Sequence, residues 1–127
     1  MTKLKQIQGN PNALRAFLKT LTDRLPERIQ LSPPMPEILI KAIGVDPEEI
    51  REYWITLGAK KARLQLLIVQ NTLSINHIQT AKGSPTLSET EKEEAGRLFV
   101  ELVLLPGLAN KELTGLKLVL IQEDSEN

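Results

Sequence analysis

The sequence predicts an all-α domain of about five helices packed around a central helix without formal charge. The first observation is residues 64–81, which contain no Asp, Glu, Lys or Arg although 25% of the chain is charged. A surface helix normally has a charged stripe opposite its apolar one, so this segment is expected to be buried on most sides. The second observation is a helix start signal before each of three other apolar segments. The third is that no segment offers a convincing strand partner, and one strand cannot satisfy its own backbone.

The first helix is expected after a short N-terminal segment. Residues 1–9 alternate polar and apolar residues and are interpreted as a flexible lead-in to a single helical domain of residues 10–122. An acidic tail, residues 123–127, follows that domain. Asn10 is the expected N-cap and Pro11 the first helical residue. The apolar residues that follow recur at intervals of three and four, which is typical of a helix with one buried face: Leu14, Phe17, Leu18, Leu21 and Leu25.

Two more helices are expected after a rigid, proline-rich connector at residues 32–36. A short apolar helix follows the connector and is closed by Gly44. Asp46 and Pro47, followed by two glutamates, then repeat the start signal, because acidic residues suit the first turn of a helix. The helix that starts here is expected to break at Gly58, and its buried face consists of Ile50, Tyr53, Trp54 and Leu57.

The central helix is expected from residue 59 to about residue 82, and another helix follows it. Ser88 and Glu91 form a capping box that predicts this next helix, which ends near Pro106. Residues 109–122 fit two structures, because their leucines suit a helix and their last apolar run suits a short strand. The helix is preferred because the strand would lack a partner. The core face of the helix after Ser88 is Ala95, Leu98, Phe99, Leu102, Val103 and Leu105.

Composition limits what the protein can do. A chain of 127 residues fits one domain with a core of its own. Sixteen basic residues balance sixteen acidic ones, so the chain as a whole has no net attraction to nucleic acid or anionic lipid. Without cysteine there is no disulfide, thiol nucleophile or thiolate metal site. No apolar run reaches the roughly 18 residues that span a bilayer. We expect no membrane contact and a cytoplasmic protein, since the first residues lack the apolar core of a secretion signal.

Residues that could carry catalysis or bind a metal are few. His77 is the only histidine, and its polar neighbours Ser74, Asn76 and Gln79 include no carboxylate that could orient it. The glutamates of residues 89–94 are interpreted as favourable charge at a helix N-terminus, because no Glu-x-x-His pair accompanies them. We therefore predict a protein that is not an enzyme, with no catalytic residue, cofactor or metal, and a structural or surface role for His77.

The expected function is a small helical interaction module, such as an adaptor, an assembly factor or a regulatory subunit, that associates with itself or with another protein. On a helix, Asn71 would lie within an apolar stripe, where one amide can fix the register of a dimer. The alternative is that Asn71 bonds to backbone or water inside a monomer. Residues 98–105 and 116–121 hold more apolar residues than one core face needs, which suggests a homodimer. The expected interface residues are Ile68, Asn71, Ile75, Leu98, Leu102, Leu116 and Leu120.

A DNA-binding regulator is the alternative function. Residues 36–57 look like a helix-turn-helix, with Gly44, Val45 and Ile50 at suitable spacing. Ile40 occupies a position that usually holds a small residue, and the second helix would begin with acidic residues that repel phosphate. A corner of two packed helices is therefore preferred to a DNA reader. The residues that would contact nucleic acid are Arg51, Lys60, Lys61 and Arg63.

Overall fold

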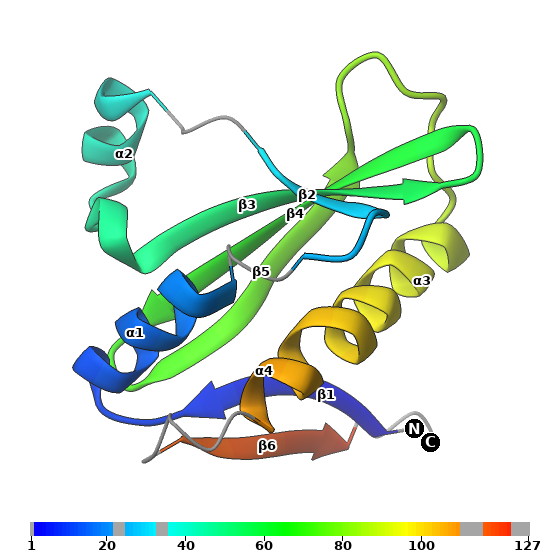
Figure 1. Ribbon diagram of the computed structural model, residues 1–127. Helices are drawn as coiled ribbons and strands as arrows, with labels where there is room; N and C mark the ends of the chain where they lie inside the picture. The colour runs from blue at the N-terminus through cyan, green and yellow to red at the C-terminus, as the bar shows by residue number, and fades with distance from the viewer. Residues whose placement is uncertain (1, 22–24, 33–35, 110–115, 123–127) are drawn as a thin grey trace.

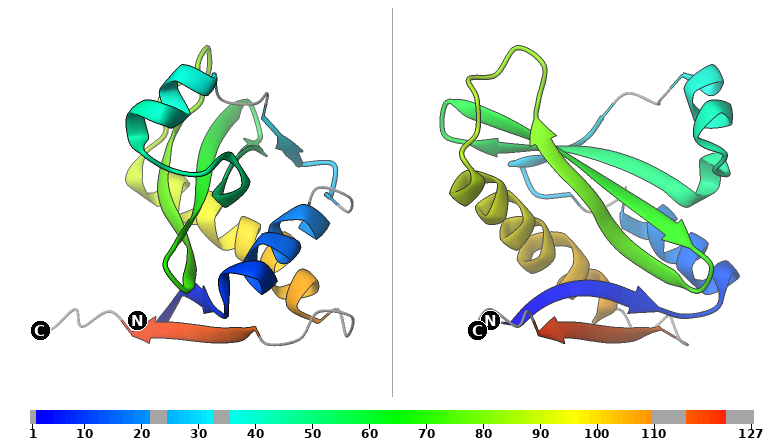
Figure 2. Two further views of the ribbon diagram at one scale, coloured as in Figure 1. Left: turned by 90° about the vertical axis from the view of Figure 1, so that its left-hand side faces the viewer. Right: turned by 180° about the vertical axis from the view of Figure 1, so that it is seen from behind.

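An antiparallel sheet of six strands forms the centre of the computed structural model, which describes residues 2–21, 25–32, 36–109 and 116–122. The strand order across the sheet is β2-β3-β4-β5-β1-β6. Helices α1, α3 and α4 lie on one side of the sheet, and α2 lies at the end where β3 begins (Figure 1, Figure 2). In chain order the elements are β1 (Thr2–Gln8), α1 (Pro11–Leu21), β2 (Ile29–Leu31), α2 (Glu37–Ile43), the 3₁₀ turn η1 (Pro47–Glu49), β3 (Ile50–Leu57), β4 (Lys60–Val69), β5 (Thr72–Thr80), α3 (Glu89–Phe99), the π-helical segment η2 (Val100–Leu104), α4 (Leu105–Leu108) and β6 (Lys117–Gln122).

The prediction of an all-α domain was wrong, and the central segment shows this most clearly. Residues 64–81 form no helix and belong mostly to β4 and β5, which pair from Ala62 opposite Thr80 to Val69 opposite Thr72. Both are middle strands of the sheet, with a neighbouring strand on each side. The expected burial on most sides holds for only part of the segment. Leu64, Leu66, Ile68 and Leu73 are at most 3% exposed, whereas Val69 is 54% exposed.

The residue types in this segment suit strands better than a helix. Apolar residues recur here at intervals of three and four but also at intervals of two, so periodicity alone did not separate the two structures. β-branched residues lose side-chain freedom in a helix and pack well on the pleated surface of a sheet. The segment is rich in them, and they are Ile68, Val69, Thr72, Ile75, Ile78 and Thr80.

Two tight turns connect β3, β4 and β5. Gly58 follows β3 with a φ of +60°, and Gln70 follows β4 with a φ of 58°. Among the described residues, Gln70 is the one non-glycine residue with a positive φ. Asn71 lies in the same turn, where its carbonyl oxygen accepts a hydrogen bond of 3.1 Å from the Gly9 N–H. The helical stripe around Asn71 on which the dimer seam was predicted is therefore not formed.

Replacing Gln70 with glycine is expected to raise the free energy of unfolding by about 1 kcal/mol. The left-handed conformation costs an L-residue about that much, because its Cβ approaches the following carbonyl oxygen, whereas glycine lacks this contact. Urea denaturation followed by circular dichroism measures the change. Asn71→Gly is the matched control, since Asn71 does not share the positive φ. Equal or opposite effects of the two substitutions would show that turn strain is not the cause.

The prediction of a helix after Asp46 was also wrong. The Asp46 side chain accepts a hydrogen bond of 2.8 Å from the Glu48 N–H, as a cap should, but only Pro47–Glu49 turn helically. The chain then continues as β3, with Tyr53 and Ile55 buried and Trp54 between them partly exposed. Burial alternates with a period of two because the strand is covered on one face. Residues 36–57 thus contain neither a helix-turn-helix nor a corner of two helices.

Both ends of the described chain lie in the sheet. Residues 1–9 were expected to be a flexible lead-in, but Thr2–Gln8 form β1, which pairs with β5 and β6. The preference for a helix in residues 109–122 was wrong over Lys117–Gln122, which form β6 opposite β1. The partner that seemed to be missing lies more than a hundred residues earlier in the sequence. Leu113 and the acidic tail of residues 123–127 lie outside the described residues.

The helices whose start signals are local agree with the sequence. The Ala13 N–H donates to Asn10 Oδ1 at 2.8 Å, which confirms Asn10 as the cap of α1. Gly44 closes α2 with a φ of 83°. The capping box of α3 is formed as predicted, with the Glu91 N–H donating to Ser88 Oγ and the Ser88 N–H donating to Glu91 Oε1. These elements depend on contacts within one turn of chain, so neighbouring residues are sufficient to specify them.

The core lies between the sheet and the helices. Its largest fully buried side chains are Phe17 of α1, Tyr53 of β3 and Phe99 of α3. The rings of Tyr53 and Phe99 are 4.9 Å apart between centroids and tilted by 48°, a favourable geometry for two aromatic rings. The Tyr53 hydroxyl is buried and has no hydrogen-bond partner among the described residues. Burial raises the pKa of Tyr53 to about 12, although the nearby Arg51 lowers it.

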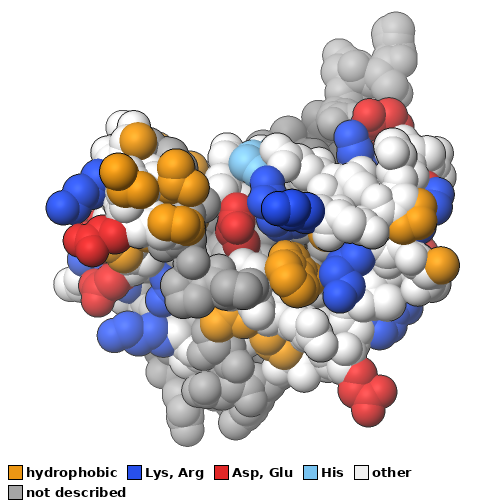
Figure 3. All heavy atoms as spheres, turned by 90° about the horizontal axis from the view of Figure 1, so that it is seen from above, with side chains coloured by type: hydrophobic (Ala, Val, Ile, Leu, Met, Phe, Trp, Pro, Cys, Tyr) orange, Lys and Arg blue, Asp and Glu red, His pale blue; other side chains and the backbone are white. Residues whose placement is uncertain are grey.

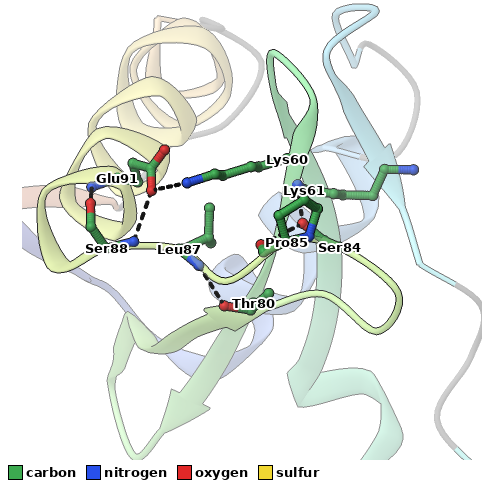
Figure 4. Close-up of polar contacts among 8 residues, drawn as sticks. All are labelled: Lys60, Lys61, Thr80, Ser84, Pro85, Leu87, Ser88 and Glu91. Atoms are coloured by element: carbon green, nitrogen blue, oxygen red, sulfur yellow. Dashed lines mark hydrogen bonds and ion pairs between the residues drawn. The ribbon is translucent and has the colours of Figure 1, made fainter.

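Polar contacts hold the start of α3 against the sheet (Figure 4). Lys60 Nζ of β4 lies 2.8 Å from Glu91 Oε1. The hydrogen bond from Lys60, followed by the one from the Ser88 N–H, lowers the pKa of the Glu91 carboxyl. The loop before α3 is joined to the strands by two further bonds, from the Lys61 N–H to Ser84 Oγ at 2.8 Å and from the Leu87 N–H to Thr80 Oγ1 at 3.0 Å.

Candidate functional site

The candidate site is the face of β3, β4 and β5 that is turned away from α1 and α3. Residues alternate between the two faces of a strand, so the neighbours of buried Tyr53, Ala62 and Leu64 lie on this other face. Within the part of the chain that the structure describes, no helix covers the middle of it (Figure 2). We call it the open sheet face, and it is formed by Glu52, Trp54, Lys61, Arg63, Gln65, His77 and Gln79.

A tryptophan between two cations forms one part of the open sheet face. Trp54 on β3 lies directly opposite Arg63 on β4. Lys61 Nζ lies 5.0 Å from the centroid of the Trp54 ring, within the range of a cation–π interaction. Arg63 Nη2 donates a hydrogen bond of 2.6 Å to Gln79 Oε1 on β5. These contacts hold a flat aromatic surface and two positive groups in fixed positions.

A chain of hydrogen bonds crosses the same face one row away. Gln65 Nε2 donates to Glu52 Oε2 at 3.2 Å, and Asn76 Nδ2 donates to Gln65 Oε1 at 2.7 Å. Asn76 Nδ2 also lies 3.4 Å from His77 Nδ1. A register shift between Gln65 and Leu66 leaves Asn76 as an extra residue on β5, which brings its amide beside Gln65. Gln65 itself is only 5% exposed, so the row holds the partly buried Glu52 carboxylate and the exposed Asn76 amide in fixed positions.

Hydrophobic side chains adjoin this face on α2. Ile38 is 75% exposed and Leu39 is 51% exposed, whereas Ile40 of the same helix is buried. Figure 3 shows hydrophobic side chains gathered over α2, on the same side of the molecule as the histidine and a group of basic side chains. An apolar patch beside a polar one is characteristic of a binding surface.

The expected interface residues are spread over different parts of the molecule. Asn71 lies in the turn after β4. Leu120 lies in β6, where its backbone is opposite that of Leu4. Leu102 is 37% exposed on η2. The other four pack in or against the core, with Ile68 and Leu98 buried and Ile75 and Leu116 partly buried.

The residues expected to contact nucleic acid separate into two groups. Lys61 and Arg63 lie together on the open sheet face. Lys60 is on the opposite face and is bound to Glu91 of α3. Arg51 donates through Nη1 to the carbonyl oxygens of Pro47 and Ile50 at 2.8 Å each, so it supports the turn before β3. The structure therefore does not bring the four cations together.

The sequence analysis did not single out Glu52, Trp54, Gln65 or Gln79 as one surface. A signal for it was present, since polar or partly exposed residues alternate with apolar ones on both sides of Gly58. Residues 52–56 and 61–65 each show this period of two, which is typical of strands covered on one side. Interpreted as helices, the same residues point in all directions and no common face is apparent.

The described residues contain no group of three His, Cys, Asp or Glu side chains that could hold a metal ion. A core cavity of about 10 Å³, lined by residues that include Leu66, Leu73 and Leu104, has room for one water molecule at most. Comparison of the chain with protein-family models, curated proteins and solved structures gives no match. Among the described helices, none has the length and apolar character that crossing a membrane requires.

Proposed function

We propose that the protein is a non-enzymatic interaction module that binds a partner protein across the open sheet face and α2. The observation that carries this proposal is the exposure of Ile38 and Leu39 on α2, together with the paired Trp54 and Arg63 of the open sheet face. Tryptophan and arginine dominate the binding energy of many protein interfaces, and apolar side chains of this kind fill the pockets of a partner. A cytoplasmic location is part of the same proposal.

The chemistry of the face supports binding rather than reaction. It gathers an indole, an imidazole, two cations, amides and a carboxylate, and none of the seven residues that define it carries a hydroxyl or thiol nucleophile. Lys61, Arg63, Gln65 and Asn76 are already held by neighbours, so a partner would immobilise fewer free side chains on binding. The partner surface that fits would offer aliphatic groups to α2 and a carboxylate to Lys61 or Arg63.

The test compares three single variants of the full chain as bait in a lysate of the source cells. Leu39→Glu places a charge on the apolar part of the surface, and Arg63→Glu reverses a charge on the polar part. Both substitutions are expected to reduce the amount of captured partner about tenfold or more. Leu105→Glu is the matched control, because Leu105 is 41% exposed on α4, away from the surface. The proposal would be contradicted if all three variants captured equal amounts of partner. It would also be contradicted if neither the variants nor the wild type captured any partner.

Single-stranded nucleic acid is a second candidate for the same face, without a helix-turn-helix. The observation in its favour is that Trp54 lies beside Lys61 and Arg63, since bases stack on aromatic rings while cations contact phosphates. Glu52 on the same face and the exposed side chains of α2 favour a protein instead. Titration of a labelled single-stranded oligonucleotide at several salt concentrations decides between them. Nucleic-acid binding would be weakened by Arg63→Glu and left unchanged by Lys60→Glu, which alters the opposite face.

A further inference from the structure

The two edges of the sheet differ in how they are protected. The β2 edge has only three residues, Ile29–Leu31, and prolines stand near both of its ends in the sequence, at Pro26 and Pro33. Short edge strands and prolines are common protection against pairing with other chains. At the other edge, β6 has six residues, and within the described residues it pairs with β1 alone. Figure 1 shows β6 as the outermost strand.

The sequence of β6 lacks the usual protection of an edge. Its four middle residues, Leu118 to Ile121, are all aliphatic, and it contains no proline or glycine. Its one charged residue, Lys117, is at the very start. An uninterrupted run of four aliphatic residues is a sequence pattern typical of strands that are not at an edge. The neighbouring β1 differs, because Gln6 and Gln8 alternate with buried Ile7.

We propose that two copies of the chain pair antiparallel through β6 and continue the sheet across a two-fold axis. Such a contact is self-complementary and closed, because the same strand serves both copies. Antiparallel pairing separates the two Lys117 residues, whereas parallel pairing would place them opposite each other. In the sequence, basic Lys117 begins β6 and acidic Glu123 and Asp124 follow its last residue, a charge order that favours antiparallel over parallel pairing of two copies. The inference goes beyond the proposed function, since β6 and β3 are separated by three strands.

The oligomeric state of two lysine variants tests this dimer. Val119 lies opposite Gln6 in the register, near the middle of β6, so Val119→Lys places a charge in the middle of the edge strand. Sedimentation at micromolar concentration is expected to give the mass of two chains for the wild type. Val119→Lys should raise the dissociation constant about tenfold or more. Gln30→Lys, the same charge on the β2 edge, should leave the dimer intact. A wild type that remains at the mass of one chain, or a dimer that Val119→Lys leaves unchanged, overturns the inference.

Hydrogen exchange of the unmodified protein provides a second measurement that does not depend on how a variant folds. The amides of residues 117–122 are expected to exchange more slowly as protein concentration rises, while those of residues 29–31 do not change. Exchange in β6 that is independent of concentration would overturn the inference. The dimer and the proposed partner surface can be tested independently of each other. Val119→Lys should still capture the partner protein, and Leu39→Glu should still form the dimer.

Discussion

Replacing Phe99 with alanine is expected to lower the free energy of unfolding by about 3–5 kcal/mol, the range for deleting a large aromatic side chain from a core. The Phe99 ring is fully buried and packs against Tyr53, so its removal leaves a cavity between α3 and the sheet. Because domains of this size are stable by only about 5–15 kcal/mol, the variant is expected to be partly unfolded at moderate temperature.

The measurement is urea denaturation of the wild type and the variant, followed by circular dichroism. Leu102→Ala is a suitable control, since Leu102 lies three residues further along the same helical stretch and is 37% exposed. We expect this control to lose much less stability, because little apolar surface is returned to water. A loss below about 1.5 kcal/mol for Phe99→Ala would show that α3 does not seal the core as described.

Raising the pH from 10 to 12 is expected to remove roughly 2 kcal/mol of stability through Tyr53 alone. Burial raises the pKa of its hydroxyl from 10.0 to about 12 in the folded protein. Below pH 10 the hydroxyl is protonated in both states, so the effect is absent there. Above pH 10 the unfolded chain releases the proton first and is favoured until the folded pKa is reached. Two pKa units correspond to roughly 2.7 kcal/mol in full, and roughly 2 kcal/mol of this falls between pH 10 and pH 12.

Tyr53→Phe isolates this contribution from the lysines that titrate in the same range. The variant is expected to lose roughly 2 kcal/mol less stability than the wild type between pH 10 and pH 12. At neutral pH it should be more stable by about 1 kcal/mol, because it removes a buried hydroxyl without a hydrogen-bond partner. Since Tyr53 is the only tyrosine, tyrosinate absorbance reports its titration directly. Equal losses of stability for the two proteins, or ionisation near pH 10 without unfolding, would contradict the prediction.

The open sheet face could have been predicted only with the correct secondary structure. Trp54, Arg63 and Gln79 lie in one row because three strands pair in a particular register. A shift of one residue in that register would turn every one of these side chains to the other face. Lys60 and Lys61 illustrate this, since adjacent residues in the sequence bind Glu91 of α3 and the Trp54 ring on opposite sides of the sheet.

Neighbouring residues and composition were sufficient to predict the cap of α1 at Asn10, the end of α2 at Gly44, the capping box of α3 and the burial of some of the aliphatic residues in 64–81. The choice between helix and strand for β3, β4, β5 and β6, and with it the location of the candidate site, depended on contacts between distant parts of the chain. The physical reason is that a helix satisfies its backbone within one segment, whereas a strand depends on a partner. For β6 that partner is β1, at the other end of the sequence.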